Sequence, residues 1–282
     1  MPHFKIDFDL PASQRYQEVY LHFGETIAQM EDYFYESLPP AMRAFYADEE
    51  NLSAFRHAQP DVYEAMVALS AVIDRNITQT VTVNQITEFS TYCTSIVARN
   101  EDGEISHVRN LDFSATSLMK QLVYVAVLVK DGVERAQAPC IAGYYGSYTG
   151  HKPDSFSVSY NVRETVVYPS MDMIYSNLER SIDSAYTPLW SLIQDLLLAQ
   201  DTTFASAVEE LSTRDVTSPG YVIVGGLRGN EGVVIARDAV GTNHTRWLTE
   251  DTWYVAQTNR DVWRDHDDAR YNSAVSYMDA LG

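Results

Sequence analysis

Residues 92–113 read YCTSIVARNEDGEISHVRNLDF and carry the clearest structural signal in the chain. Thr94 to Ala98 are small or β-branched, which suits a half-buried strand. Asn100 to Gly103 form a polar turn, with glycine where the backbone needs a positive φ. Glu104 to Val108 return as a second strand. The stretch therefore predicts a β-hairpin with chemically active side chains at its open end.

The open end of this hairpin brings a cysteine toward a cation and a carboxylate. If the register allows it, the short turn places Cys93 close to Arg109 and Asp112. A thiol attacks only as the thiolate, and a nearby cation favours that form. A carboxylate beside it can hold a protonated amine. The local pattern indicates an activated cysteine.

The motifs CTSIVA, the acidic glycine turn and H-x-R-N-L-D-F resemble the start of the β-subunit in the acid ceramidase and N-acylethanolamine acid amidase family. These are N-terminal-nucleophile (Ntn) cysteine hydrolases of the choloylglycine-hydrolase type. The resemblance implies that the chain cuts itself between Tyr92 and Cys93 and that the freed α-amine of Cys93 acts as the base. It also implies catalytic roles for Arg109 and Asp112.

Two later segments extend the resemblance. Residues 142–150, AGYYGSYTG, are similar to the family's A-G-Y-x-G-x-x-T-G, which lies near the reacting carbonyl and implies substrate-binding roles for Tyr144, Tyr145 and Gly146. Residues 253–259, WYVAQTN, are similar to W-Y-V-x-Q-T-N. This match implies that Asn259 is the oxyanion-hole asparagine.

The chain departs from the family pattern at two places. The family's D-D-R-R appears as Asp267-Asp268-Ala269-Arg270, which leaves open whether Arg270 replaces the missing arginine. We include Arg270 among the catalytic candidates. The family's N-E-R appears as Asn161-Val162-Arg163, so a glutamate of the site is absent, while Asn161 remains a substrate-binding candidate. These departures leave substrate choice and efficiency open.

Composition limits the partners. The 282-residue chain has a formal net charge of −19, so we expect no nucleic-acid partner and little adsorption to anionic membranes at neutral pH. Acidic pH would neutralise many carboxylates, which leaves contact with a membrane surface or a lipid carrier open. Only two cysteines occur, Cys93 and Cys140, which gives no disulfide framework.

No cofactor or targeting signal is indicated. Met1 to Lys5 do not begin an apolar leader, so the chain as given is expected to be cytoplasmic, or lysosomal or secreted if a leader was removed. The run Asp265-His266-Asp267-Asp268 is interpreted as a solvated turn, and no zinc-ligand spacing occurs. We expect neither a metal nor another cofactor.

The periodicity predicts a mixed α+β protein. Ser13 is expected to cap a helix with one apolar side, formed by Tyr16, Val19, Tyr20, Phe23, Ile27, Met30 and Phe34. Helices are expected over 13–38, 41–57, 60–73, 83–90, 188–200 and 203–212, and further strands over 4–10, 122–130, 156–164, 221–226, 232–237 and 253–259. The resemblance implies an Ntn-hydrolase αββα four-layer sandwich. It divides the chain into a helical α-subunit-like segment, 1–92, and a β-subunit-like catalytic domain, 93–282.

The sequence thus predicts a self-processing cysteine amidohydrolase that cleaves N-acyl lipids, ceramides or N-acylethanolamines, into fatty acid and amine. The α and β fragments are expected to stay associated after the cut. Two alternatives stay open. One is an amidase of the bile-salt or penicillin V acylase type, although those enzymes have the nucleophile almost at the translated N-terminus. The other is a catalytically silent relative that binds lipids.

Overall fold

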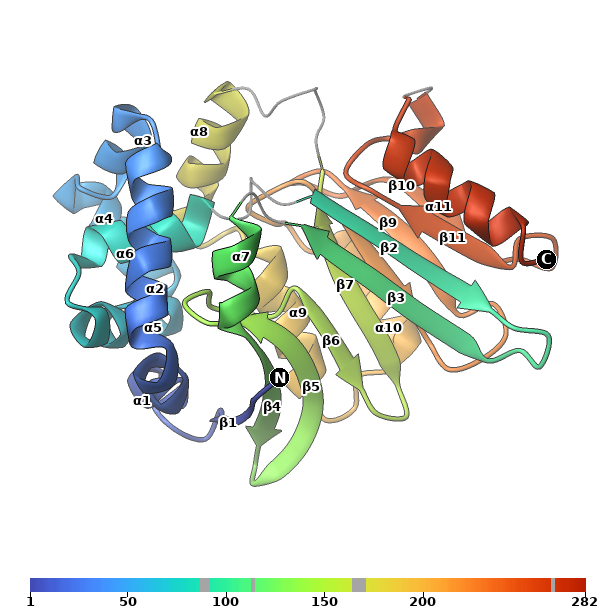
Figure 1. The fold of residues 1–282 in the computed structure, drawn as a ribbon, viewed down its shortest axis with the longest axis horizontal. Helices are drawn as coiled ribbons and strands as arrows, with labels where there is room; N and C mark the ends of the chain where they lie inside the picture. Colours follow the sequence, from blue (N-terminus) through green and yellow to red (C-terminus); the bar gives the residue numbers. More distant parts are fainter. Residues whose placement is uncertain (87–91, 113–114, 164–170, 265–266) are drawn as a thin grey trace.

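The computed structural model describes residues 1–86, 92–112, 115–163, 171–264 and 267–282, and two β-sheets form its centre (Figure 1). The larger sheet has the strand order β1 (His3–Asp7), β4 (Val123–Lys130), β5 (Val133–Ile141), β6 (Thr149–Lys152), β7 (Phe156–Val162), β8 (Gly220–Gly225), β9 (Gly232–Arg237) and β10 (Thr242–Trp247). The smaller sheet has the order β11 (Tyr254–Gln257), β2 (Tyr92–Arg99) and β3 (Ile105–Asp112).

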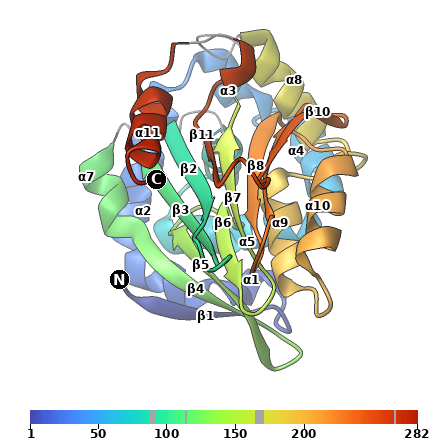
Figure 2. The same cartoon turned by 90° about the vertical axis from the view of Figure 1, so that its right-hand side faces the viewer.

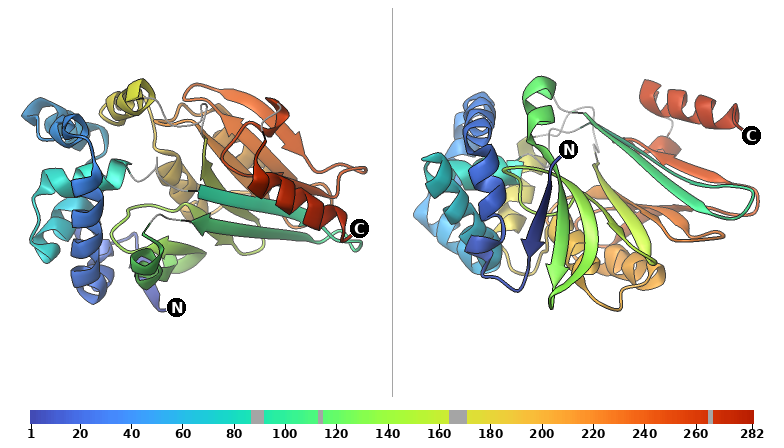
Figure 3. Two further views of the ribbon diagram at one scale, coloured as in Figure 1. Left: turned by 45° about the horizontal axis from the view of Figure 1, so that its top comes forward. Right: turned by 60° about the horizontal axis from the view of Figure 1, so that its bottom comes forward.

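Helices lie on the outer sides of both sheets, so the layers run helix, sheet, sheet, helix (Figures 1 and 2). The helices on the side of the larger sheet that faces away from the smaller sheet are α1 (Ala12–Arg15), α2 (Gln17–Ser37), α3 (Pro40–Phe45), α4 (Glu49–Ala58), α5 (Pro60–Ile73), α6 (Ile77–Ile86), α8 (Met171–Ser181), α9 (Leu189–Leu198) and α10 (Phe204–Thr213). Helix α11 (Ala269–Asp279) lies outside the smaller sheet, as both views in Figure 3 show. This arrangement confirms the predicted α+β class.

Strands β8 and β9 are buried at every position because both of their faces are covered. One face packs on helices, and its residues belong to the main core together with Trp190, Ile193 and Leu197 of α9. The opposite face packs on the smaller sheet through a second core of Val97, Tyr221, Ile223, Val234, Ala236, Leu248 and Val255. This second core fills the part of the space between the two sheets that lies under β8 and β9.

The N-terminal segment shares the larger sheet with the rest of the chain. Strand β1 pairs in parallel with β4, from His3 opposite Val125 to Asp7 opposite Val129. Every member of the apolar side predicted on the first long helix is buried. Among the described residues, no helix has both the length and the apolar character needed to cross a bilayer. The segment is thus helical, with one strand that anchors it.

Most predicted elements are confirmed, with shifts that local chemistry explains. The helix predicted from Ser13 begins earlier, at Ala12 after Pro11, and is interrupted at Tyr16, where α1 ends and α2 follows. The helix predicted over 41–57 is two helices, because the Asp48 side chain caps a new N-terminus at Glu49. The short helix predicted over 83–90 begins earlier, at Ile77, and residues 87–90 lie outside the described part of the chain.

Candidate active site

Cys93 lies near the start of β2, with its side chain on the inner face of the smaller sheet. It pairs with Leu111 of β3, and Ser95 pairs with Arg109. Directly paired residues share a face and neighbours along a strand alternate, so these side chains point toward the larger sheet. Cys93 is completely buried. The predicted hairpin is confirmed, and the register turns its cysteine inward.

The Arg109 guanidinium lies against the Cys93 thiol and is held from two other strands. Its Nη2 lies 3.5 Å from Cys93 Sγ and donates to the Tyr160 carbonyl at 2.7 Å. Its Nη1 donates to Thr149 Oγ1 at 2.7 Å. These bonds fix the positive charge of Arg109 beside the sulfur.

Asn259 and Arg270 meet the main chain on either side of this thiol. The Cys93 N–H donates to Asn259 Oδ1 at 2.7 Å, and Arg270 Nη2 donates to the same oxygen at 3.1 Å. Arg270 Nη1 donates to the Cys93 carbonyl at 3.1 Å, and the guanidinium carbon lies 5.1 Å from the centre of the Tyr92 ring. Arg270 is the second residue of α11, whose N-terminus is capped by the Asp268 side chain. Arg270 is therefore part of the site.

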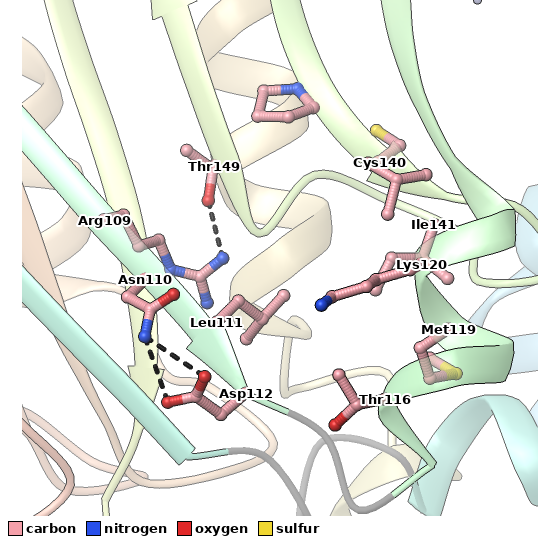
Figure 4. A pocket seen from close by; sticks show the side chains of 12 residues that line it. Arg109, Asn110, Leu111, Asp112, Thr116, Met119, Lys120, Cys140, Ile141 and Thr149 are labelled. Atoms are coloured by element: carbon pink, nitrogen blue, oxygen red, sulfur yellow. Dashed lines mark hydrogen bonds between the residues drawn. The ribbon is translucent and has the colours of Figure 1, made fainter. Parts of the chain in front are cut away.

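Two cavities flank Arg109. One, of about 420 Å³, is lined by side chains from β3, β5 and the segment 116–123, including Asp112, Lys120 and Ile141 (Figure 4). The other, of about 460 Å³, runs between β3 and β7 and includes His107 and Phe156. Arg109, Pro139 and Thr149 line both cavities. A bound molecule could thus extend to either side of the guanidinium.

Comparison with known proteins relates this geometry to characterised relatives. No family model matches the chain. An N-acylethanolamine-hydrolyzing acid amidase from Caenorhabditis elegans is 28% identical over 99% of this chain and 80% of its own length. The acid ceramidase of Homo sapiens is 27% identical over 94% of this chain and 71% of its own length. A solved structure of the C. elegans ortholog of N-acylethanolamine-hydrolyzing acid amidase superposes on this chain with a TM-score of 0.60 at 34% identity. The match covers 67% of this chain and 80% of that one.

The chain belongs to the acid ceramidase and N-acylethanolamine-hydrolyzing acid amidase family. The resemblance inferred from the hairpin motifs is confirmed. Its relatives are amidohydrolases, so the site around Cys93 is the candidate active site of an enzyme of this family.

Asp112 lines the cavity of about 420 Å³, but as the last residue of β3 it alternates with Arg109 and Leu111, whose side chains face inward. It pairs with Tyr92, one residue before the cysteine, and both are exposed on the outer face. Its carboxylate accepts two hydrogen bonds from Asn110 Nδ2, each 3.1 Å long. In the uncut chain the Cys93 N–H donates to Asn259 Oδ1 rather than to the Asp112 carboxylate.

The tyrosines of the AGYYG segment are buried on the helical side of the larger sheet. The Tyr144 hydroxyl contacts Met30 Sδ at 3.3 Å, and the Tyr145 ring packs against Tyr16 and Trp190. Gly146 has φ 95°, and a Cβ there would lie 2.2 Å from the Trp190 ring. These side chains shape the core and do not line either cavity beside Arg109.

Asn84, which sequence reasoning missed, fixes the position of this segment. Its Nδ2 donates to the Gly143 carbonyl at 2.6 Å, and its Oδ1 accepts from the Tyr145 N–H at 3.3 Å. Asn84 belongs to α6, so the helix that precedes the cleavage region also holds the glycine-rich segment. An asparagine within a helix has no local pattern that predicts such a long-range contact.

Asn161, the last substrate-binding candidate, contacts protein groups in the interior. Its Oδ1 accepts from Ser95 Oγ at 2.9 Å, and its Nδ2 donates to the Gln257 carbonyl at 3.0 Å. It is completely buried between the sheets. In this structure it supports the end of β11.

Two residues beyond Asn259, a buried ion pair holds the chain. Arg163 bonds Asp261 through Nε at 2.7 Å and Nη2 at 2.9 Å, and the Tyr221 hydroxyl donates to the same carboxylate at 2.5 Å. Burial opposes ionisation of Asp261, but the bonds from Arg163 and Tyr221 hold its pKa below the ordinary value. This clamp fixes the turn that carries Asn259.

Val162 stands where the N-E-R pattern of the resemblance has glutamate, and its main chain contacts the site. Its carbonyl accepts from Asn259 Nδ2 at 2.8 Å, which orients the carboxamide. Within the described ranges, no group of three or more His, Cys, Asp or Glu side chains is arranged to hold a metal ion. Residues 265 and 266 of the acidic turn lie outside those ranges.

Proposed function

We propose that this chain is a self-processing cysteine amidohydrolase that cuts its own Tyr92–Cys93 bond and then hydrolyses the amide bond of N-acyl lipids. The observation that supports this most is the convergence of Arg109, Asn259 and Arg270 on Cys93 from three separate elements. A small buried hydrophobe at a strand start would need none of these partners.

Self-cleavage would begin with attack by the Cys93 sulfur on the Tyr92 carbonyl carbon. The carbon–nitrogen bond breaks as the Cys93 nitrogen takes up a proton, which leaves a thioester between Tyr92 and the Cys93 sulfur. Water then hydrolyses the thioester and releases a carboxylate at Tyr92. The result is a free α-amine on the residue that also carries the thiol, the arrangement of an N-terminal nucleophile.

Turnover would use the same sulfur on a substrate amide. The α-amine accepts the thiol proton, the sulfur attacks the amide carbon, and the amine half leaves with a proton. The Asn259 carboxamide, whose Nδ2 donates to the Val162 carbonyl at 2.8 Å in the uncut chain, is the candidate donor to the oxyanion. Water hydrolyses the thioester to the fatty acid. Cleavage would also release Tyr92 from opposite Asp112, freeing the amine to turn toward that carboxylate.

The substrate class follows from the relatives and the cavities. Relatives are named for ceramides and N-acylethanolamines, both N-acyl amides with a long apolar part. The cavities flanking Arg109 combine apolar residues such as Leu111 and Phe156 with polar ones such as Lys120. An amide seated at Arg109 could extend its two halves to opposite sides.

Intact mass measurement of the purified protein, before and after incubation at acidic pH, tests self-processing. We expect fragments that break between Tyr92 and Cys93, and none from Cys93→Ala. Cys140→Ala is the matched control for loss of a thiol, because Cys140 is the other cysteine of the chain and is buried; it lines the cavity of about 420 Å³ beside Arg109, and its thiol contacts the Gly146 carbonyl at 3.9 Å. A Cys93→Ala chain that is still cut there would contradict the assignment of the nucleophile.

Turnover is tested with labelled substrates on the cut protein. A panel of one ceramide, one N-acylethanolamine and one bile-salt conjugate should yield fatty acid from the first two classes and a thioester trapped on Cys93. An uncut, inactive wild-type chain that still retains the labelled lipid would favour the silent lipid-binding relative instead.

A further inference from the structure

A row of buried polar side chains between the two sheets connects His107 with the residues just before Asn259. Ser95 comes from β2, and Ser159 and Asn161 come from β7; all three are completely buried. At one end the row contacts the His107 ring of β3, and at the other end it contacts the Gln257 carbonyl, where β11 ends. Polar groups in a filled interior are retained only when their hydrogen bonds are satisfied, so each contact can be assigned a direction.

The direction is set at Asn161. Its amide nitrogen lies 3.0 Å from the Gln257 carbonyl and 3.4 Å from the Thr258 carbonyl. A carbonyl only accepts, so this end of the amide must be the nitrogen and the other end the oxygen. The oxygen lies 2.9 Å from Ser95 Oγ and therefore accepts the single proton of that hydroxyl.

The remaining protons follow in turn. Because Ser95 has used its proton, its 2.9 Å contact with Ser159 requires Ser159 to donate. Ser159 has then used its own proton, so its 3.0 Å contact with His107 requires the ring to donate from Nε2. The other ring nitrogen, His107 Nδ1, lies 3.0 Å from Ser157 Oγ, a hydroxyl whose single proton can go either to this nitrogen or to the Gly225 carbonyl at 3.2 Å.

The neutral ring that this pattern needs agrees with the surroundings of His107. Burial, and then the charge of Arg109, lower the pKa of His107 to about 4. The ring is therefore neutral above that pH and has a single N–H. The hydrogen-bond directions place that proton on Nε2.

The row ends at the main chain of Gln257 and Thr258, directly before Asn259. Strand β11 is an edge strand, and its last pair is Gln257 with Ser95. Beyond that pair no described strand pairs with the main chain, and the Asn161 amide donates to the carbonyls of Gln257 and Thr258. The next residue is Asn259, whose Oδ1 accepts from the Cys93 N–H.

We propose that His107 is a positioning residue for the Cys93 site, whose Nε2 proton orients the Ser159–Ser95–Asn161 row and thereby the Asn259 carboxamide. This role rests on the proposed function of Cys93. It requires no contact between His107 and substrate.

The self-cleavage rate and kcat of His107 variants test this positioning role. We expect His107→Phe, which fills similar space without a donor, to lower the self-cleavage rate and kcat by ~10–100-fold, because small misplacement of a reacting group has costs of this order. Because His107 also lines the cavity between β3 and β7, KM is measured beside kcat, and a positioning role requires the loss to fall mainly on kcat. His107→Gln retains an N–H near the Nε2 position and should restore most of the rate.

Two serine variants separate this role from general packing. Ser159→Ala should reproduce the kcat loss of His107→Phe. Ser70→Ala also removes a buried hydroxyl, one bonded to the Val67 carbonyl in α5, and should leave kcat unchanged. A His107→Phe protein with a wild-type kcat, or a His107→Gln protein as impaired as His107→Phe, overturns the positioning role.

Nitrogen-15 NMR of the ring in Cys93→Ala gives a readout that needs no catalysis. We expect a neutral ring with the proton on Nε2, and a proton on Nδ1 overturns the proposal. A wild-type chain that neither cuts itself nor turns over substrate overturns the proposed function and this role with it. An active wild type with an undisturbed His107→Phe variant overturns the role alone.

Discussion

Arg270 bears directly on the family's missing arginine. Position 269, which matches the first arginine of D-D-R-R, is alanine, yet Arg270 contacts the Cys93 carbonyl, Asn259 Oδ1 and the Tyr92 ring. A guanidinium makes such contacts simultaneously because its donors form a planar fork. Arg270 therefore contacts the residues on both sides of the Tyr92–Cys93 bond, the bond that we propose is cut.

We expect Arg270→Ala to slow self-cleavage by ~10–100-fold, the order of loss for a misplaced reacting group. Arg270→Lys retains the charge but only a point contact, so it should be intermediate. A time course of intact mass measures the rates. Arg214→Ala, which removes an exposed arginine paired with Glu210 on α10, is the control. A wild-type cleavage rate in Arg270→Ala would show that the contact has no role in the cut.

For single residues, the sequence predicted which side chains lie close together better than it predicted which face of its strand each side chain occupies. Cys93 and Arg109 were expected to meet because a tight hairpin brings its ends together, and they do. The face of Asp112 depends on the register, since a shift of one residue reverses every side chain. The His107 row requires β3 to lie on β7, and no local pattern in the sequence contains that pairing.

At the scale of elements, strong apolar periodicity was predictive and weak periodicity was not. The buried side of α2 was identified residue by residue. Helix α11 escaped prediction because Met278 is its only buried residue. Strand β10 alternates between exposed and half-buried positions without apolar residues on one side, and β5 includes Pro139. Packing against neighbours, rather than local preference, forms these elements.

The contact between α2 and α6 contains a buried carboxyl group with a testable pH dependence. Glu31 is 1% exposed; its Oε2 accepts from Thr80 Oγ1 at 3.0 Å, and its Oε1 has no hydrogen-bond partner in the structure. Burial raises the pKa of Glu31 to about 8. The folded chain therefore retains a proton at pH values where the unfolded chain, with a pKa near ~4.3, has lost it.

The sign follows from this difference. The stabilising effect of the Glu31 proton is complete below the unfolded pKa and is lost as the pH rises toward about 8, by at most ~1.4 kcal/mol per pH unit. The free energy of unfolding of Glu31→Gln minus that of the wild type should therefore increase as the pH rises over this range. Urea titrations at several pH values measure it. Glu25→Gln, an exposed site on the same helix, should show no such trend, and a constant difference for Glu31→Gln would refute the prediction.

At the scale of the whole molecule, the proposed cut at Tyr92–Cys93 would divide the sequence without dividing the cores. Strand β1 belongs to the first fragment, yet it pairs with β4 of the second, and Ile6 is completely buried beneath the helices. Phe23 of α2 packs near the Tyr124 ring, with centroids 6.2 Å apart. Each fully buried large apolar side chain contributes ~1.5–3 kcal/mol, so separation of the fragments would expose a prohibitive apolar area.

We therefore expect the cut protein to elute as one species at the position of the uncut Cys93→Ala chain, and to resolve into two fragments only in denaturant. Size-exclusion chromatography with light scattering makes the comparison. Phe23→Asp, which buries a charge at the interface, should release the first fragment after cleavage, because an unpaired buried charge is strongly destabilising. Leu21→Asp, on the exposed side of the same helix, should not. Two separate species from the native cut protein would mean that the shared sheet and core do not hold the halves together.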